Sequence, residues 1–223
     1  MKKILYIYIV LYSSFCFSQN IFLTEAKEIH ANSDKFLYAL KEEPKTDAQY
    51  LGKIEVSGFS NDDSAVFSEI YKKAKSIGGN TYYMKPAENI EGNSTFNPHH
   101  YILYIYYKEK QTIPQKENTV YLINPEKEIE VRINNKKIKL PQRSFLQLDL
   151  SQQEITDISV GKFLGSRIKL QAKNNQLEQY FQISGKKIST NSAASPGINY
   201  KTGDIIALEK SFAEFLLTIY EKI

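Results

Sequence analysis

The segment Asn61-Asp-Asp-Ser-Ala-Val-Phe-Ser-Glu-Ile-Tyr-Lys-Lys-Ala-Lys-Ser-Ile-Gly-Gly-Asn80 carries the most complete set of local folding signals in the chain. Residues 61–64 supply Asn, Asp and Ser side chains, whose oxygens cap helix N-termini. The apolar residues that follow recur three and four positions apart, so they share one helical face: Val66, Phe67, Ile70, Ala74 and Ile77. The segment predicts a helix from about Asp63 to Ile77 that packs on a sheet.

Gly78-Gly79-Asn80 ends this pattern, because Gly and Asn adopt the left-handed backbone that stops a helix before a strand. A phosphate-binding loop would instead place its glycines before a helix, where N–H groups point outward. These three residues therefore predict a structural turn.

Four short apolar runs flank the predicted helix, at residues 35–41, 50–56, 81–84 and 100–107. The first two are separated by the polar, Pro-bearing segment 42–47, and together they predict a β-hairpin. The last run is apolar and aromatic enough for a central strand. Residues 86–98, which carry Asn, Gly and Ser, predict a loop. The resulting order is ββαββ, a small α/β domain.

The run from Tyr50-Leu-Gly-Lys-Ile-Glu-Val56 through the helix to Lys73-Ala-Lys-Ser-Ile-Gly-Gly-Asn80 and a Tyr-rich strand resembles the small α/β domain of the YbjQ-like proteins and the RcsF envelope stress-sensor lipoproteins. Those families show a comparable strand, helix, Ala-x-x-x-Gly-Ala-Asn, strand pattern. The resemblance covers about residues 35–107 and implies their fold. The sensor's disulfides and lipid-attachment motif have no counterpart here, so the resemblance does not extend to sensing.

The second half is rich in short runs that alternate apolar with polar residues, which predicts strands with one buried face. They lie at 119–123, 128–133, 137–140, 145–150, 155–160, 167–171 and 180–183. Asn134-Asn135 suits a tight hairpin turn, because Asn tolerates positive φ. This half predicts an antiparallel β-sandwich or barrel-like domain, and its opening resembles sandwiches that occur as accessory modules in bacterial envelope proteins.

The C-terminal tail changes to a helical period. Ser211-Phe-Ala-Glu214 matches a capping box, and Phe212, Phe215, Leu216 and Ile219 follow on one stripe. We expect a C-terminal helix docked on a sheet. A strand over residues 215–220 is the alternative. The whole chain is therefore expected to be α+β.

A domain boundary is predicted near 110–117, where the sequence is polar and contains Pro114. Residues 19–112 carry 11 basic and 13 acidic side chains, whereas residues 113–223 carry 16 and 12. We expect a small α/β domain at 19–112, a linker at 113–117 and a β-rich domain at 118–223.

The first 18 residues predict a secretory signal: Lys2-Lys3, a short apolar run, then small residues before a cut at Ser18-Gln19. Removal lowers the formal net charge from +4 to +2, which does not indicate nucleic-acid binding. Cys16 is the one cysteine, and Ser13 and Phe15 do not match a lipoprotein motif, so a lipid anchor is the less favoured alternative. The protein is expected to be exported, to the periplasm or cell surface, without a transmembrane span after cleavage.

Few residues carry catalytic signals. His30, His99 and His100 are the three histidines, and neighbours on a strand point to opposite faces. No Gly-x-Ser-x-Gly elbow occurs, and Gly161–Ser166 lacks the lysine of a phosphate loop. The pairs Asp62-Asp63, Glu42-Glu43, Lys136-Lys137 and Lys186-Lys187, and the turn Ser195-Pro-Gly197, fit caps, turns and strand edges. We therefore assign no catalytic, cofactor-binding or metal-binding residue.

With 42% hydrophobic and 24% charged residues, the chain is typical of a globular protein. We expect a non-enzymatic two-domain module of the cell envelope that binds a protein or another envelope component through a sheet edge or an aromatic patch. The alternative is a small secreted hydrolase whose site is assembled from scattered residues. A deep pocket with convergent His and carboxylate side chains would favour the hydrolase.

Overall fold

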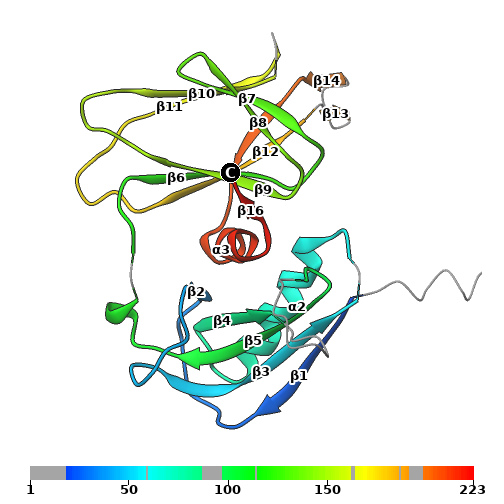
Figure 1. Cartoon of the computed structure of the whole chain (residues 1–223), viewed down its shortest axis with the longest axis vertical. Coiled ribbons are helices and arrows are strands. Elements are labelled where there is room, and N and C mark those ends of the chain that lie inside the picture. The colour runs from blue at the N-terminus through cyan, green and yellow to red at the C-terminus, as the bar shows by residue number, and fades with distance from the viewer. Residues whose placement is uncertain are drawn as a thin grey trace, which may run out of the picture. The chain divides into compact units, whose positions relative to one another are not determined.

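The computed structural model divides into two compact units between Ile113 and Pro114 (Figure 1). It describes residues 19–58, 60–86, 97–113, 115–161, 164–185, 187–190 and 198–223. The predicted signal at 1–18 and the turn at 195–197 lie outside these ranges. The division falls in the predicted linker, and independent folding of the two halves stays a prediction.

The described chain is mixed α+β, with mostly strands, two α-helices, three sheets and a two-stranded ribbon, and none of its sheets closes into a barrel. The prediction of an α+β fold is confirmed at this level. Within the described ranges, no helix is long and apolar enough to cross a membrane.

The first unit is a five-stranded sheet with one α-helix against it. Its elements are β1 (Asn20–Ala26), β2 (Tyr38–Leu40), β3 (Gln49–Ser57), α2 (Asp63–Ser76), β4 (Thr81–Pro86), β5 (His100–Tyr107) and the 3-10 turn η1 (Lys110–Thr112). The strand order is β1-β3-β5-β4-β2, and only β2 and β4 run parallel.

The hairpin predicted from residues 35–41 and 50–56 is wrong. β2 pairs with β4 in parallel, with Tyr38 opposite Thr81, whereas β3 lies between β1 and β5. The apolar run supplies only three strand residues, and Tyr38, 3% exposed, is held beside β4 by its N–H bond to the carbonyl of Asn80 at 2.8 Å. The place beside β3 is taken by β1, which we did not predict.

Helix α2 matches its prediction closely. The Asp62 carboxylate accepts a hydrogen bond from the Ala65 N–H at 2.9 Å, which caps the N-terminus. The side chains on the predicted stripe are all buried: Val66, Phe67, Ile70, Ala74 and Ile77. The helix therefore packs on the sheet by the face that the sequence indicates.

The Gly78-Gly79-Asn80 turn is structural, as predicted, but each residue has a different role. Gly78 has φ +81°, and a Cβ there would lie 1.7 Å from the His30 carbonyl oxygen. A Cβ on Gly79 would lie 2.3 Å from Ile105 Cγ2. Asn80 is not left-handed. Its buried side-chain amide accepts a hydrogen bond from the Lys108 N–H at 2.9 Å and donates one to the Lys108 carbonyl at 2.7 Å. These two bonds tie the start of β4 to the end of β5.

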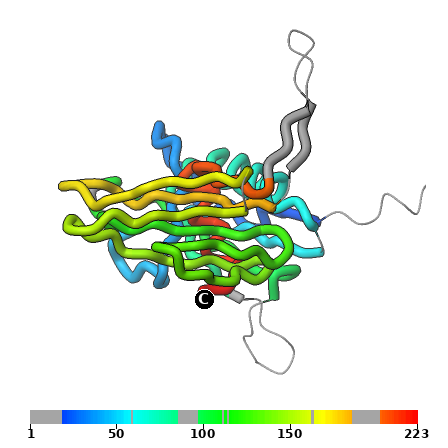
Figure 2. The backbone as a smooth tube through the Cα atoms, turned by 90° about the horizontal axis from the view of Figure 1, so that it is seen from above, coloured from blue at the N-terminus to red at the C-terminus, as the bar shows by residue number. Residues whose placement is uncertain are grey.

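The second unit stacks two sheets and a helix (Figures 1 and 2). A four-stranded sheet, β11-β10-β7-β8, comprises β7 (Ile129–Ile133), β8 (Lys136–Leu140), β10 (Thr156–Val160) and β11 (Ser166–Leu170). A five-stranded sheet, β15-β12-β6-β9-β16, comprises β6 (Thr119–Asn124), β9 (Ser144–Asp149), β12 (Gln179–Ser184), β15 (Asp204–Ala207) and β16 (Glu221–Lys222). The ribbon joins β13 (Lys187–Thr190) and β14 (Ile198–Lys201).

One hydrophobic core lies between these two sheets. It draws Val120, Leu122 and Ile183 from the five-stranded sheet, and Val131 and Ile158 among others from the four-stranded sheet. The four-stranded sheet is antiparallel throughout, but β6 and β12 are parallel, as are β9 and β16. The expectation of a fully antiparallel domain is therefore wrong. β12 and β16 pair with strands that lie far away in the sequence, and no local turn signal predicts such pairings.

The predicted C-terminal helix is confirmed as α3 (Lys210–Ile219), and the strand alternative is wrong apart from the short β16 that follows. The expected capping box is not formed. Glu209 caps the helix instead, because its carboxylate accepts from the N–H groups of Ser211 and Phe212. Asn134 and Asn135 have φ of 47° and 67°, as the predicted tight turn requires.

Candidate binding surface

The sheet of the first unit is covered by α2 on one face only. Along β5, the buried residues Tyr101, Leu103 and Ile105 alternate with the half-buried Ile102 and Tyr104. The first set points towards α2. Gly79, just after the helix, shows this, because a Cβ there would touch both Ile105 and the Ala74 carbonyl of the helix. Within the described part of the first unit, no helix packs on the second set.

We call this second side the open face. The strand register aligns two rows of side chains across it and adds Tyr50 beside them. The rows are Tyr83-Tyr104-Lys53 and Lys85-Ile102-Glu55-Phe22. Residues directly opposite on neighbouring strands have Cβ atoms about 4.5–5.5 Å apart, so each row is continuous. Phe22 is 56% exposed.

Tyrosine rings gather towards one end of the open face, where Tyr106 is buried (5% exposed) and Tyr50 and Tyr104 are half-buried. The ring centroids of Tyr50 and Tyr104 are 6.2 Å apart, and those of Tyr50 and Tyr106 are 5.5 Å apart in an edge-to-face arrangement. The Tyr50 hydroxyl donates to Glu25 Oε2 at 3.2 Å, and Lys27 Nζ lies 5.9 Å from the same ring. These contacts fix the rings before any partner arrives.

The phenols of Tyr50 and Tyr106 have raised pKa values and are neutral at physiological pH. Burial, together with the nearby Glu43 carboxylate, raises the pKa of Tyr106 to about 12. Burial and the hydrogen bond to Glu25 also raise the pKa of Tyr50. Neutral phenols offer a flat apolar ring and one O–H donor each, which suits binding and does not suit proton abstraction.

The rim of the open face is charged with both signs. His100 Nε2 lies 2.9 Å from Glu55 Oε1, and these side chains are 46% and 37% exposed. Lys53 stands opposite Tyr104 in the register. An aromatic centre with a polar rim is the usual anatomy of a protein-binding surface.

The three histidines are dispersed. His30 stacks on Tyr107 with ring centroids 3.7 Å apart, and its N–H bonds the Ile77 carbonyl, so it packs the loop before β2 against the sheet. His99 lies in the exposed turn before β5, and His100 pairs with Glu55. No group of three or more His, Cys, Asp or Glu side chains that could hold a metal ion occurs in the described parts of the chain.

The remaining sequence candidates have local roles. Asp62 caps α2, Glu42 and Glu43 lie in the loop after β2, and Lys136 and Lys137 begin the edge strand β8. Gly161 has φ +82° where the chain passes Thr202, and residues 162 and 163 lie outside the described ranges. Lys186 and residues 195–197 also lie outside them.

A shallow pocket of about 480 Å³ opens beside the loop before β2. It is lined by Asn32, Ser33, Asp34, Lys35, Phe36, Asn80, Tyr107 and Lys110. Lys75 fastens this loop, because its ammonium donates to the carbonyls of Asp34 and Phe36 at 2.7 and 2.5 Å, and burial lowers its pKa. The lining brings no histidine to the Asp34 carboxylate, so it does not form the site that the hydrolase alternative requires.

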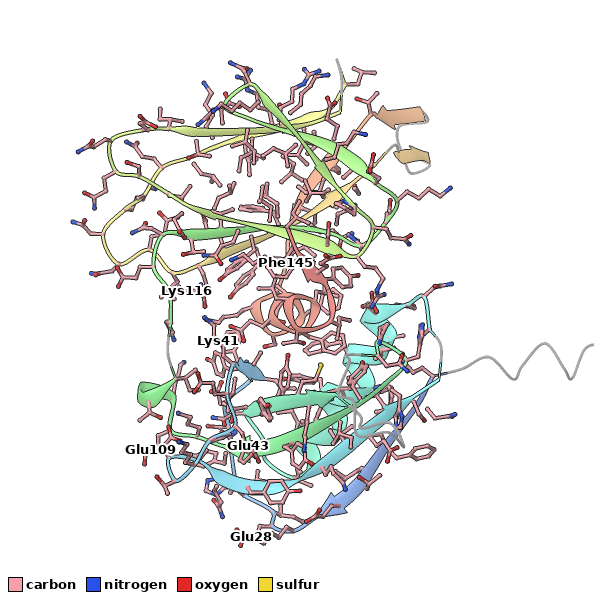
Figure 3. The ribbon with its side chains drawn as sticks, viewed as in Figure 1. Glu28, Lys41, Glu43, Glu109, Lys116 and Phe145 are labelled. Atoms are coloured by element: carbon pink, nitrogen blue, oxygen red, sulfur yellow. The ribbon has the colours of Figure 1, made fainter. Side chains whose placement is uncertain are left out.

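The second unit contains an ionic cluster that the sequence did not reveal. Lys210 Nζ lies 2.7 Å from Glu178 Oε1 and 3.6 Å from Glu214 Oε1, and all three side chains are less than a fifth exposed. Nearby, Tyr121 and Tyr180 stack with centroids 5.2 Å apart, and Phe145 flanks Tyr121 (Figure 3). Burial raises the pKa of Tyr121 to about 12. This cluster fastens α3 to the five-stranded sheet.

The chain was also compared with known proteins. No family model, no curated protein and no solved structure matches it.

The candidate binding residues that the sequence analysis missed are the tyrosines of the open face. Tyr104 and Tyr106 are two positions apart on β5, the spacing that puts both on one face of a strand. That signal was present, but Tyr50 and Tyr83 join them only through pairing of β3 and β4 with β5.

Proposed function

We propose that this chain is an exported, non-enzymatic binding module of the cell envelope, and that it recognises a protein partner through the open face of its first sheet. The single observation that carries the proposal is the tyrosine cluster on the face of the first sheet opposite α2. The YbjQ- and RcsF-like pattern over residues 35–107 and the signal-like residues 1–18 support the envelope location.

A protein partner fits the chemistry of this face best. Tyrosine rings give a large contact area with only two rotatable side-chain bonds, and aromatic residues dominate the energetically important centres of protein interfaces. Tyr50 and Tyr106 are already held by neighbouring groups, so less conformational entropy is lost on binding. Lys53, Glu55 and Lys85 around them would set orientation more than affinity.

The proposal is tested with the double variant Tyr83→Ser/Tyr104→Ser. Both side chains are half-buried on the open face, and neither belongs to the core under α2. Crosslinked pull-down from the native envelope, read by mass spectrometry, should recover a defined protein with the unmodified chain. Recovery should fall at least about tenfold with the variant, as expected when interface hot spots are lost.

The matched control is Ile29→Ser. Ile29 is 79% exposed in the same unit and lies outside the open face, so its replacement should leave recovery unchanged. Thermal melting of each protein checks that the fold is retained. Equal recovery by the double variant, or no specific protein recovered by the unmodified chain, would refute the proposal.

A further inference from the structure

Strand β1 is an unusual sheet edge within this molecule. Exposed edges are normally kept from pairing with other chains by shortness or by charge. Three of the other edge strands are short: β2, β15 and β16 have three, four and two residues. Edge strand β8 carries three lysines, and β11 carries Arg167 and Lys169.

β1 has neither protection over most of its length. It has seven residues, β3 is its one neighbour among the strands that the structure describes, and the stretch Asn20-Ile-Phe-Leu-Thr24 contains no charge and no proline. Phe22 is 56% exposed on the open face, and Ile21 and Leu23 are only half-buried on the other face. An edge of this kind is a template for a further strand.

The sequence of β1 is complementary to itself in one antiparallel register. With Phe22 opposite Phe22 of a second copy, Ile21 meets Leu23 and Asn20 meets Thr24, so apolar residues pair with apolar and polar with polar on each face. Glu25 then falls opposite Gln19, and no like charges meet. A register centred on Leu23 would instead oppose Ile21 to Glu25. The shift in β1–β3 pairing between Leu23 and Glu25 sets the end of the regular stretch.

We propose that two copies of this chain pair through β1 in this register, about a two-fold axis that passes between the two Phe22 residues. The two sheets then continue as one, with both open faces on the same side. The pairing does not depend on the proposed protein partner, but it would place two tyrosine clusters on the same side of the joined sheet, at opposite ends along the strands.

The decisive variants exploit the pairing of residue 22 with itself. Phe22→Lys opposes two like charges across the axis, and within its own chain it faces Glu55, so the unit should still fold. Phe22→Asp opposes two carboxylates. In analytical ultracentrifugation the unmodified chain should sediment as a dimer and each variant as a monomer. An equimolar mixture of the two variants should return to a dimer, because lysine then meets aspartate.

Ile29→Lys is the control, because it adds the same charge at an exposed site outside β1 and should remain dimeric. Cysteine crosslinking checks the register in the chain that begins at Gln19, which contains no other cysteine. Phe22→Cys should crosslink to itself, whereas Asn20→Cys should not, since the two copies of residue 20 lie about 13 Å apart in this register. An unmodified chain that stays monomeric, or a variant mixture that fails to pair, would overturn the proposal. Dimers of the Phe22→Lys variant alone would also overturn it.

Discussion

The central strands of the two units, β5 and β6, differ in how their two faces are used. Every residue of β6 is buried, because one face of its sheet packs on the four-stranded sheet and the other lies under α3. Along β5, burial mostly alternates, and the second face carries Ile102 and Tyr104 half-buried. The five-stranded sheet of the second unit therefore supplies stability on both sides, whereas one side of the first sheet is only partly buried within its own unit.

The same difference appears in where the polar groups go. In the second unit, Lys210 and Glu178 pair with each other, and their side chains are only 18% and 7% exposed. On the open face, Glu55 and His100 are also paired, but both remain more than a third exposed. Exposed pairs contribute little to stability, so changes to the Glu55–His100 pair should have a small effect on the fold.

The largest expected effect is on stability, and it distinguishes β6, which is packed on both faces, from β5, which is packed mainly on one. The side chains of Leu122 and Ile123 point to opposite faces of β6. Because both faces are packed, Leu122→Ala and Ile123→Ala should each lower the free energy of unfolding by about 2–5 kcal/mol. On β5, Leu103→Ala should cost the same amount, whereas Ile102→Ala should cost about 1 kcal/mol or less. Urea titration of the four variants measures these values.

Equal losses for Ile102→Ala and Leu103→Ala would show that the open face is covered in solution. A small loss for Ile123→Ala would show that α3 does not seal the outer face of the five-stranded sheet.

A second comparison uses one buried asparagine in each unit. Asn80 holds two backbone groups of Lys108, and Asn124 donates to the carbonyls of Lys127, Leu140 and Pro141. Replacement by alanine leaves buried backbone groups without partners, so each variant should lose about 2–4 kcal/mol.

Calorimetry should assign the two losses to different units. Asn80→Ala should lower the melting of the first unit alone, and Asn124→Ala that of the second. If both variants shift one common transition, the two units do not unfold independently.

The smallest effect concerns an ion pair on the outer side of the four-stranded sheet. The hydrogen bonds from the Arg167 guanidinium lower the pKa of Asp157. A carboxyl group with a lowered pKa in the folded state adds stability above its unfolded pKa of about 3.9, and this stability is lost as the pH falls through the folded value.

When the pH falls below about 4, the Arg167→Gln variant should therefore lose less stability than the unmodified chain does. Denaturant titrations at neutral and acidic pH compare the variant with the unmodified chain. A steeper loss in the variant would contradict the direction of this pKa shift.

The elements with complete local signals could be predicted from the sequence. Helix α2 has its cap, its apolar stripe and its terminating Gly78 within twenty residues, and the alternating strands of the second unit also follow from local pattern. What failed depends on distant parts of the chain. β2 pairs with β4 across the helix, β6 pairs with β12, and β1 carries the polar residues Thr24 and Glu25 that hide its strand character.

The sequence predicted an aromatic patch as a possible binding surface, but it did not identify all the residues that form it. An aromatic patch was one of two expected modes of binding, and Tyr104 and Tyr106 have the spacing of one strand face. The contribution of Tyr50 and Tyr83 depends on strand register, which is fixed by the packing of the whole sheet.

Site-specific photocrosslinking tests most directly that the open face of the first unit is the binding surface. A photoreactive phenylalanine analogue is placed at position 104 on the open face, or at the control position 139 on β8, where Lys139 is 73% exposed. After irradiation in the native envelope, the chain labelled at 104 should give a discrete protein adduct and the chain labelled at 139 should not. Adducts from 139 alone, or from neither position, would contradict the account.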